Sequence, residues 1–354
     1  MNSLWENQAF SVGEAPYSWS DAAVAAVLRG EWASLEAQTR RGLALVARAE
    51  ATENAASEEE LEAAAEEFRY GRDLVTAEEM EDWLDRHGLT LEDWMDYIER
   101  ALVRQSDPEE EEEEALAPFA PSDEEIAGCI WTEAICSGAL ARFARTLAGR
   151  AAVAQRAEAE AEMGEAEQPN LPKIERACRD CADAFSRMAL RPASRERIAD
   201  LLRLEHLYET WSRRFADPAA IRALINVHRL DWIRLDLRDL GFSDETSARE
   251  AALCVREDSE PLEAVAQEAH RPIAKTRPYL AEVEESARPV LLSARPGDLV
   301  GPVAVGDEFH LYELCGKTPP SEQDPEIRSR AENALLAKVV EHEIAARVHW
   351  REQI

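Results

Sequence analysis

The stretch RPGDLVGPVAVGDEFHLYEL, residues 295–314, constrains the fold most, because it has the pattern of a β-hairpin in a chain whose other patterns are mostly helical. Its apolar residues alternate on both sides of a Gly306-Asp307 turn, with Val303 and Val305 before it and Phe309 and Leu311 after it. Alternation predicts that one face of the hairpin packs on a core, and glycine supplies the positive φ of a tight turn. The fold must therefore combine many helices with a small sheet.

Length and charge limit the class of protein. The chain has 354 residues, a formal net charge of -32 and 45% hydrophobic residues, which predicts a core divided over two or three units. Nucleic acid is not an expected partner, because phosphate recognition needs clustered Lys and Arg. No apolar run reaches the roughly 18 residues of a membrane span. The start, MNSLWENQAF, lacks the pattern of a secretory signal, and six cysteines are few for a disulfide scaffold, so we expect a cytoplasmic protein.

The patterns divide the chain into five segments. Six consecutive glutamates with prolines around them favour a solvated linker, since like charges repel and apolar residues are missing. The expected segments are a helical region at 1–105, an acidic linker at 106–122, a second helical region at 123–229, a small α+β domain at 230–318 and a C-terminal helix at 319–354 that packs on the helical region.

A helix pair is predicted between residues 76 and 105. Thr76 and Thr90 precede acidic residues as N-caps, and Gly88 ends the first helix. The apolar faces of the pair carry three aromatic residues at helical spacing, Trp83, Trp94 and Tyr97. Such residues are typical of a core, and burial is the simpler interpretation for each, although an exposed peptide groove is the alternative.

Several motifs resemble those of a known family. LEAVAQEA, SARPGDLVGPV and GDEFHLYELCGKTPP resemble the second helix, the hairpin entry and the last strand of the parvulin (rotamase) domain. LVTAEEMEDWLDRHGLTLEDWMDYIERALVR resembles the substrate-binding helical domain of SurA-type chaperones, and the chain as a whole resembles SurA-like proteins of bacterial peptide-maturation or peptide-export systems. This resemblance implies a mainly α fold with a small α+β domain, in which a C-terminal helix, capped by Asp324 with Pro325 at its first position, completes the helical N-terminal region.

The resemblance carries over only part of a catalytic site. Parvulins have a His in the first strand, a second His in the last, a nearby Cys or Asp, and a Gly-Gly-Leu-Gly loop. His310 matches the last-strand His, but Trp232 or Arg234 stands where the first is expected, and Cys254 does not match by order. Residues 270–282 are too few for the loop and its strand. We therefore expect a degenerate parvulin domain that has lost isomerase activity, with His310 as its one catalytic candidate.

No other motif predicts chemistry. Cys178-Arg179-Asp180-Cys181 is a lone CxxC without a second pair or a nearby His, so helix packing is the favoured interpretation over a zinc or redox site. No cofactor and no metal are expected.

These observations favour a chaperone that holds an unfolded or precursor peptide, with maturation or export proteins as further partners. The candidate peptide-binding residues are Trp83, Trp94, Tyr97, Phe309 and Tyr312. Two alternatives stay open, namely an active prolyl isomerase that uses His310 and an acidic structural or inhibitory protein that binds a basic partner.

Overall fold

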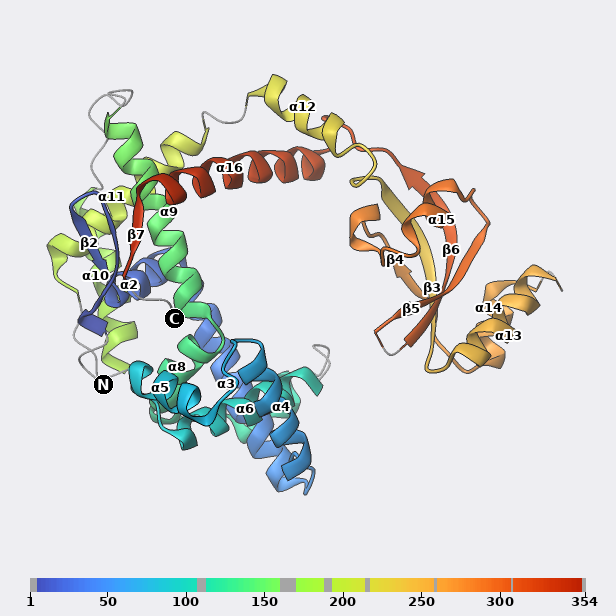
Figure 1. The fold of residues 1–354 in the computed structure, drawn as a ribbon, viewed down its shortest axis with the longest axis horizontal. Helices are drawn as coiled ribbons and strands as arrows, with labels where there is room; N and C mark the ends of the chain where they lie inside the picture. Colours follow the sequence, from blue (N-terminus) through green and yellow to red (C-terminus); the bar gives the residue numbers. More distant parts are fainter. Residues whose placement is uncertain are drawn as a thin grey trace. The chain divides into compact units, whose positions relative to one another are not determined.

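The computed structural model describes residues 5–106, 113–159, 170–187, 193–213, 217–257, 260–306 and 308–351. The chain is mainly α-helical with two small antiparallel sheets, which confirms the predicted fold class (Figure 1). It divides into two compact parts, which we call the helical unit (Met1–Arg213 with Val339–Ile354) and the sheet unit (Arg214–Lys338).

The elements of the two units follow one another along the chain. Those of the first part of the helical unit are β1 (Gln8–Val12), β2 (Ala15–Ser18), α2 (Trp19–Arg29), α3 (Glu31–Ala51), α4 (Glu58–Tyr70), α5 (Ala77–His87), α6 (Leu91–Ser106), α7 (Glu113–Leu116), η1 (Ala117–Phe119), α8 (Asp123–Cys136), α9 (Ala139–Ala159), α10 (Leu171–Arg187) and α11 (Arg195–Ser212). Those of the sheet unit are α12 (Pro218–Val227), β3 (Arg234–Phe242), α13 (Glu245–Arg256), α14 (Leu262–Glu268), β4 (Ala274–Thr276), η3 (Leu280–Glu282), α15 (Arg288–Ser293), β5 (Leu299–Val305) and β6 (Glu308–Thr318). Helix α16 (Pro325–Arg347) belongs to the sheet unit up to Lys338, and its remainder and β7 (Val348–Trp350) belong to the helical unit.

The predicted helix pair forms with the predicted caps. The Glu79 N–H donates to Thr76 Oγ1 over 3.2 Å, and the Thr76 N–H donates to the Glu79 carboxylate over 2.8 Å. Thr90 and Asp93 make the same reciprocal pair at the start of α6. Gly88 ends α5 with a φ of 63°. Each cap satisfies backbone donors that a helix start leaves free, which is why these boundaries could be placed from sequence.

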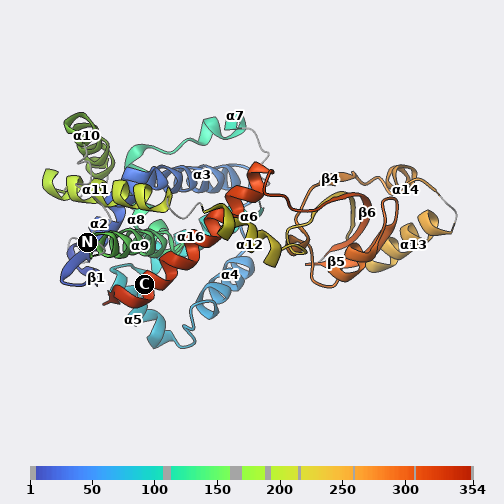
Figure 2. The ribbon, with the colours of Figure 1, turned by 90° about the horizontal axis from the view of Figure 1, so that it is seen from above.

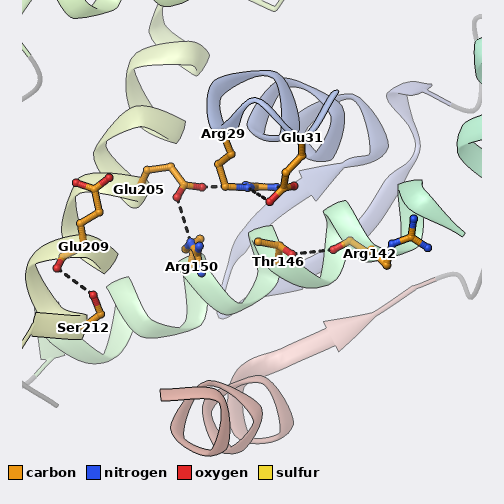
Figure 3. Close-up of polar contacts among 8 residues, drawn as sticks. All are labelled: Arg29, Glu31, Arg142, Thr146, Arg150, Glu205, Glu209 and Ser212. Carbon is orange, nitrogen blue, oxygen red and sulfur yellow. Dashed lines mark hydrogen bonds and ion pairs between the residues drawn. The ribbon is translucent and has the colours of Figure 1, made fainter. Parts of the chain in front are cut away.

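A network of ion pairs joins four helices of the helical unit (Figure 3). Glu205 on α11 accepts from Arg29 Nη1 at 2.9 Å and from Arg150 Nε at 3.0 Å, and Arg29 also binds Glu31 at 2.8 Å. The Arg150 guanidinium lies 3.5 Å from the centre of the Tyr208 ring. Burial lowers the pKa of Arg29, but the contacts with Glu31 and Glu205 outweigh it and raise the pKa overall. Arg29 and Arg150 therefore share the Glu205 carboxylate, and all three side chains are largely buried.

A three-stranded sheet of order β2-β1-β7 was not predicted from the sequence. β1 and β7 are antiparallel, with Ser11 opposite His349, and the Arg351 N–H donates to the Ala9 carbonyl over 3.0 Å. The strands have three to five residues each, too short for a clear alternation of apolar and polar positions. The signal that was overlooked is the glycine in FSVGEAPYS, since Gly13 adopts a φ of 58° at the β1–β2 turn.

Part of the expected acidic linker is structured. Residues 107–112 lie outside the described residues, but α7 and η1 follow at once, and Leu116 is buried against Ala44 and Leu45 of α3. The prediction of a linker over 106–122 is therefore corrected for its second half, because Leu116 supplies an apolar contact that outweighs the polar composition around it.

The sheet unit contains a four-stranded antiparallel sheet of order β4-β3-β6-β5 that is covered on both faces. One side, which we call the η3 face, packs Leu237, Val303 and Leu314 against η3 and α15. The other, the α13 face, packs Leu240 and Leu311 against α13 and α14, which contact each other and are both drawn at the right of Figure 2. The predicted hairpin exists, but its apolar residues do not share one face. Val303 pairs with His310 and lies on the η3 face, whereas Leu311, the next residue along β6, lies on the α13 face.

The unit boundaries differ from the expected segments. Helix α12 and the first part of α16 belong to the sheet unit, where Ile221, Trp232 and Ile327 pack in one cluster. Only the later part of α16 packs in the helical unit, as an ion pair of 2.9 Å between Arg156 and Glu343 shows. Asp324 is the predicted cap and accepts from the Glu326 N–H over 2.9 Å.

Candidate functional site

The register of β3 and β6 gathers the polar residues of the η3 face. Gly241 lies opposite His310, and Asp239 lies opposite Tyr312. Because side chains alternate along a strand, these positions all face the same side of the sheet as Val303. The absence of a side chain at Gly241 leaves room beside the His310 ring, whose Cε1 lies 3.4 Å from where a Cβ would stand.

His310 is held by a carboxylate. Its Nδ1 lies 2.7 Å from Asp239 Oδ1, and both side chains are largely buried, with 18% and 17% of their surface exposed. Its Nε2 is 3.6 Å from a Glu308 carboxylate that is 55% exposed, too far for a hydrogen bond. In the neutral ring, Nδ1–H therefore donates to Asp239, and Nε2 is left to accept a hydrogen bond from a ligand.

Tyr312 completes the cluster. Its ring centre lies 5.9 Å from that of His310, and the two planes are 20° apart. Burial raises the pKa of Tyr312 to about 12, and the negative charges of Asp239 and Glu284 act in the same direction. The hydroxyl is therefore neutral over the physiological range and is available as a hydrogen-bond donor. We call Asp239, His310 and Tyr312 the His310 cluster.

The cluster provides hydrogen bonds rather than a nucleophile. Cys254 packs on the α13 face, and Cys315 lines a pocket on that same face, so neither thiol shares the side of the sheet that carries His310. No cysteine of the described part of the η3 face approaches the ring. A donor, an acceptor and adjacent apolar side chains suit the binding of a peptide group, and they are also the groups that could ease its twisting about the C–N bond.

One expectation about this site is wrong, and a second is corrected in part. Trp232 precedes β3 and stacks on His228 at 4.9 Å, while Arg234 pairs with Thr318 at the far end of the strand. Neither residue lies opposite His310, because the register of β3 on β6 brings Gly241 there instead. Residues 270–282 were expected to be too few for the glycine-rich loop and its strand. The three-residue strand β4 forms within them, although the segment contains no glycine.

The three N-terminal aromatic candidates form a core. Trp83, Trp94 and Tyr97 surround Phe68, with ring centres 5.7, 5.6 and 6.0 Å from its own. Their exposed fractions are 6%, 4% and 8%. Burial also raises the pKa of Tyr97 to about 12. In this structure these side chains stabilise the helical unit and offer no groove surface, as the simpler interpretation of their spacing predicted.

The remaining candidates are separated by the sheet. Phe309 packs on the α13 face and Tyr312 on the η3 face, so they cannot line one surface. The sequence pointed to His310 but not to Asp239, because nothing in RLDLRDLGF distinguishes this Asp from its neighbours until the strand register is known.

The CxxC motif lies on α10. Cys178 is half-buried and Cys181 is buried, and burial raises the pKa of Cys181 to about 12. Within the described ranges, His, Cys, Asp and Glu side chains nowhere gather in a group of three or more that could hold a metal ion. Among the same residues, no helix has both the length and the apolar character needed to cross a membrane.

Comparison with known proteins was made by sequence and by structure. No protein-family model matches the chain, and no curated protein matches it either. Similar solved structures include PrsA foldases and SurA-like chaperones. A peptidylprolyl isomerase (PrsA) of Bacillus anthracis is 9% identical with a TM-score of 0.30, and covers 56% of this chain and 94% of its own. A foldase protein (PrsA) of Lactococcus lactis is 7% identical with a TM-score of 0.31, and the match covers 60% of this chain and 85% of the foldase chain.

A third similar structure corrects one expectation. It comes from Campylobacter jejuni, where PEB4 and the periplasmic protein Cj1289 are described as SurA-like chaperones, and it is 10% identical with a TM-score of 0.18 over 52% of this chain and 80% of its own. Because Cj1289 is a periplasmic protein, the cytoplasmic location expected from the sequence is corrected, and that assignment is withdrawn.

Proposed function

We propose that this chain is a chaperone-like protein that holds an unfolded or precursor peptide for maturation or export. One observation carries the proposal. The segments whose motifs resemble a parvulin domain fold together into one sheet unit, in the order strand, two helices, edge strand, helix and hairpin, with His310 on the last strand.

The η3 face supplies the chemistry of holding. The His310 cluster offers a donor and an acceptor to a peptide group, and the half-buried Val305 lies on the same side of the sheet for apolar contact. So few groups give weak and reversible binding, because the entropy that an extended peptide loses on ordering offsets most of the interaction energy. Weak binding suits a protein that must release its client.

The charge of the chain favours solubility of the complex. With a net charge of -32, two client-loaded molecules repel each other, which opposes aggregation of the clients they carry. The same charge raises the encounter rate with basic precursor segments at low ionic strength.

The test is binding of a permanently unfolded polypeptide. Reduced and carboxymethylated α-lactalbumin is titrated with the full chain, and folded α-lactalbumin serves as the reference. We expect micromolar binding of the unfolded form alone, and at least threefold weaker binding by the His310→Ala variant. Arg249→Gln, on the exposed side of α13, is the matched control and should bind as the unmodified chain does. Equal affinity for both forms, or none for either, would overturn the proposal.

A second function is favoured by the pair formed by His310 and Asp239. This pair on a parvulin-like sheet supports prolyl isomerisation as the alternative. NMR exchange on a short Ala-Pro peptide measures it directly. Acceleration that disappears in both His310→Ala and Asp239→Ala would establish the isomerase, whereas no acceleration by the unmodified chain would exclude it and leave peptide holding untouched.

A further inference from the structure

The two edges of the four-stranded sheet differ in their backbone groups. β5 forms one edge, and the Arg256 side chain of α13 donates from Nη2 to the Leu299 carbonyl at 3.2 Å and to the Gly301 carbonyl at 2.7 Å. These bonds occupy acceptors that a further strand would use. The β5 edge is therefore partly blocked by the protein itself.

β4 forms the other edge, and its backbone is open. The Leu235 N–H donates to the Pro278 carbonyl over 2.9 Å, and the Leu280 N–H donates to the Ile233 carbonyl over 2.8 Å. In an antiparallel pair, residues whose N–H and C=O groups bond to the neighbouring strand alternate with residues whose groups point away from it. Thr276 lies opposite Leu237 and bonds to β3, so Lys275 and Arg277 on either side of it turn their N–H and C=O groups outward. Among the described residues, no partner is found for the outward groups of these two residues.

A pocket of about 660 Å³ adjoins this open edge. Glu263 of α14 and Ile273 form part of its wall, and Lys275 and Arg277 contribute to its lining from the edge strand. Since Lys275 pairs with Arg238, and Arg238 pairs with Glu313, the pocket lies on the α13 face, away from the His310 cluster. It is therefore a separate site.

Lys275 is the unpaired charge at the pocket. Arg238 is bound by Glu263 and Glu313, and Arg277 donates to Asp236 at 2.6 Å. Lys275 is exposed, and the described residues provide no hydrogen bond or ion pair to its ammonium group, which attracts Glu263 only at longer range. The pocket therefore has one cation without a bonded partner, next to two free sets of backbone groups.

We propose that the outer edge of β4, together with this pocket, binds an extended segment of an unfolded polypeptide by strand addition, with an acidic side chain of that segment beside Lys275. The inference rests on the proposed function and names where a client is held. In strand addition the backbone gives affinity and alternate side chains give preference. The client residue that lies opposite Lys275 on the added strand points its side chain to the α13 face, toward the ammonium group and the pocket mouth.

Charge decides between this occupant and a second copy of the chain. Two β4 edges would bring Lys275 and Arg277 of each copy together, and like charges directly opposite one another destabilise a strand pair. A segment with a single acidic residue complements the edge, whereas a strongly acidic segment is repelled by the net charge of -32. The strand has only three residues, Ala274–Thr276, between Pro272 and Pro278, and an edge this short limits uncontrolled growth of the sheet.

The experiment uses the full chain and three fluorescently labelled nine-residue peptides of alternating Thr and Val. The first has Asp at its centre, the second has Lys there, and the third is the Asp peptide with alternate backbone nitrogens methylated to remove its edge donors. We expect the Asp peptide to bind about threefold to fivefold more tightly than the Lys peptide, the scale of one exposed ion pair. The methylated peptide should bind at least tenfold more weakly.

Two variants test the protein side. Lys275→Pro removes an outward N–H and leaves the bonds to β3 in place, so it should lose at least tenfold in affinity for both unmethylated peptides. Lys275→Glu keeps the backbone and should reverse the preference, with the Lys peptide now the tighter ligand. Unfolding temperatures equal to that of the unmodified chain would show that both variants fold. If Lys275→Pro does not fold, the reversed preference of Lys275→Glu alone tests the site.

Carboxymethylated α-lactalbumin, titrated in the same preparations, separates the two proposals. If it binds while methylation and both Lys275 variants leave peptide affinity unchanged, strand addition at β4 is overturned and the holding function stands. If sedimentation shows a dimer that Lys275→Pro abolishes, the occupant is a second copy and the inference is likewise overturned. If the peptide results are as expected but the unfolded protein does not bind, the β4 site stands and the holding function fails.

Discussion

Asp239 Oδ1 lies 2.7 Å from His310 Nδ1 across the β3–β6 pair, although the two residues are 71 positions apart in the sequence. The contact fixes the orientation of the imidazole ring and leaves its other nitrogen, 3.6 Å from the exposed Glu308 carboxylate, without a hydrogen bond to any described residue. It also places a charged acceptor beside Tyr312, whose ring lies next to that of His310. The proposed peptide holding on the η3 face depends on this geometry.

Removal of the Asp239 carboxylate should weaken peptide holding. In Asp239→Ala the ring loses the acceptor that orients it, so the affinity for carboxymethylated α-lactalbumin should fall about threefold to tenfold, the scale of one charge-assisted hydrogen bond. Glu308→Gln is the matched control, because that carboxylate is exposed and 3.6 Å from Nε2, and its affinity should be unchanged. Equal losses in both variants would show that general charge, rather than ring orientation, is responsible.

The free energy of unfolding should fall between pH 10 and 12. The pKa of Tyr97 is raised from 10.0 to about 12, so the folded state keeps a proton that the unfolded state loses in this window. The unfolded chain then binds fewer protons, and stability decreases as pH rises. Urea unfolding at pH 9 and pH 11 measures the slope. Tyr97→Phe should make the slope less steep without removing it, because the raised pKa values of Tyr312, Cys136 and Cys181 act in the same window. An unchanged slope in that variant would contradict the assignment.

The cysteines should differ in reactivity. Cys315 is exposed, whereas burial raises the pKa of Cys136 and of Cys181 to about 12. Only the thiolate attacks a disulfide reagent, so at pH 8 Cys315 should react with dithionitrobenzoate well before the two buried thiols do. Cys315→Ser should remove the fast phase. A fast phase that survives this substitution and maps to Cys136 would show that the core around α8 opens readily.

Loss of the shared carboxylate should destabilise the helical unit. In Glu205→Ala, Arg29 and Arg150 stay behind without their common partner, which should lower the free energy of unfolding by about 3 kcal/mol. Glu245→Ala breaks an exposed pair with Arg249 and should cost about 0.5 kcal/mol or less. Urea unfolding followed by tryptophan fluorescence compares the two. Similar small changes would show that the network adds little to stability.

Local signals made much of the fold predictable. Thr76, Thr90 and Asp324 are caps whose hydrogen bonds reach only two or three residues along the chain, so sequence alone identifies them. The hairpin before His310 was predictable for the same reason, because its pairing depends on one turn.

Long-range pairing was not predictable. The sheet that joins β1 to β7 brings together the two ends of the described chain, and no local pattern encodes that register. The neighbour of His310 was misjudged for the same reason, since the register of β3 on β6 decides that Gly241 lies opposite it and that Asp239 reaches it. The sequence thus indicated one member of the candidate site, and the fold supplied the others.

The most direct test of peptide holding is fluorescence anisotropy of a panel of unfolded peptides, with and without proline, titrated with the full chain at two salt concentrations. The account predicts micromolar binding that follows apolar and aromatic content and survives the higher salt, because apolar contacts and hydrogen bonds are not screened as exposed charges are. Absence of binding would contradict it. So would binding of basic peptides alone that high salt abolishes, which would leave the acidic surface as the functional feature.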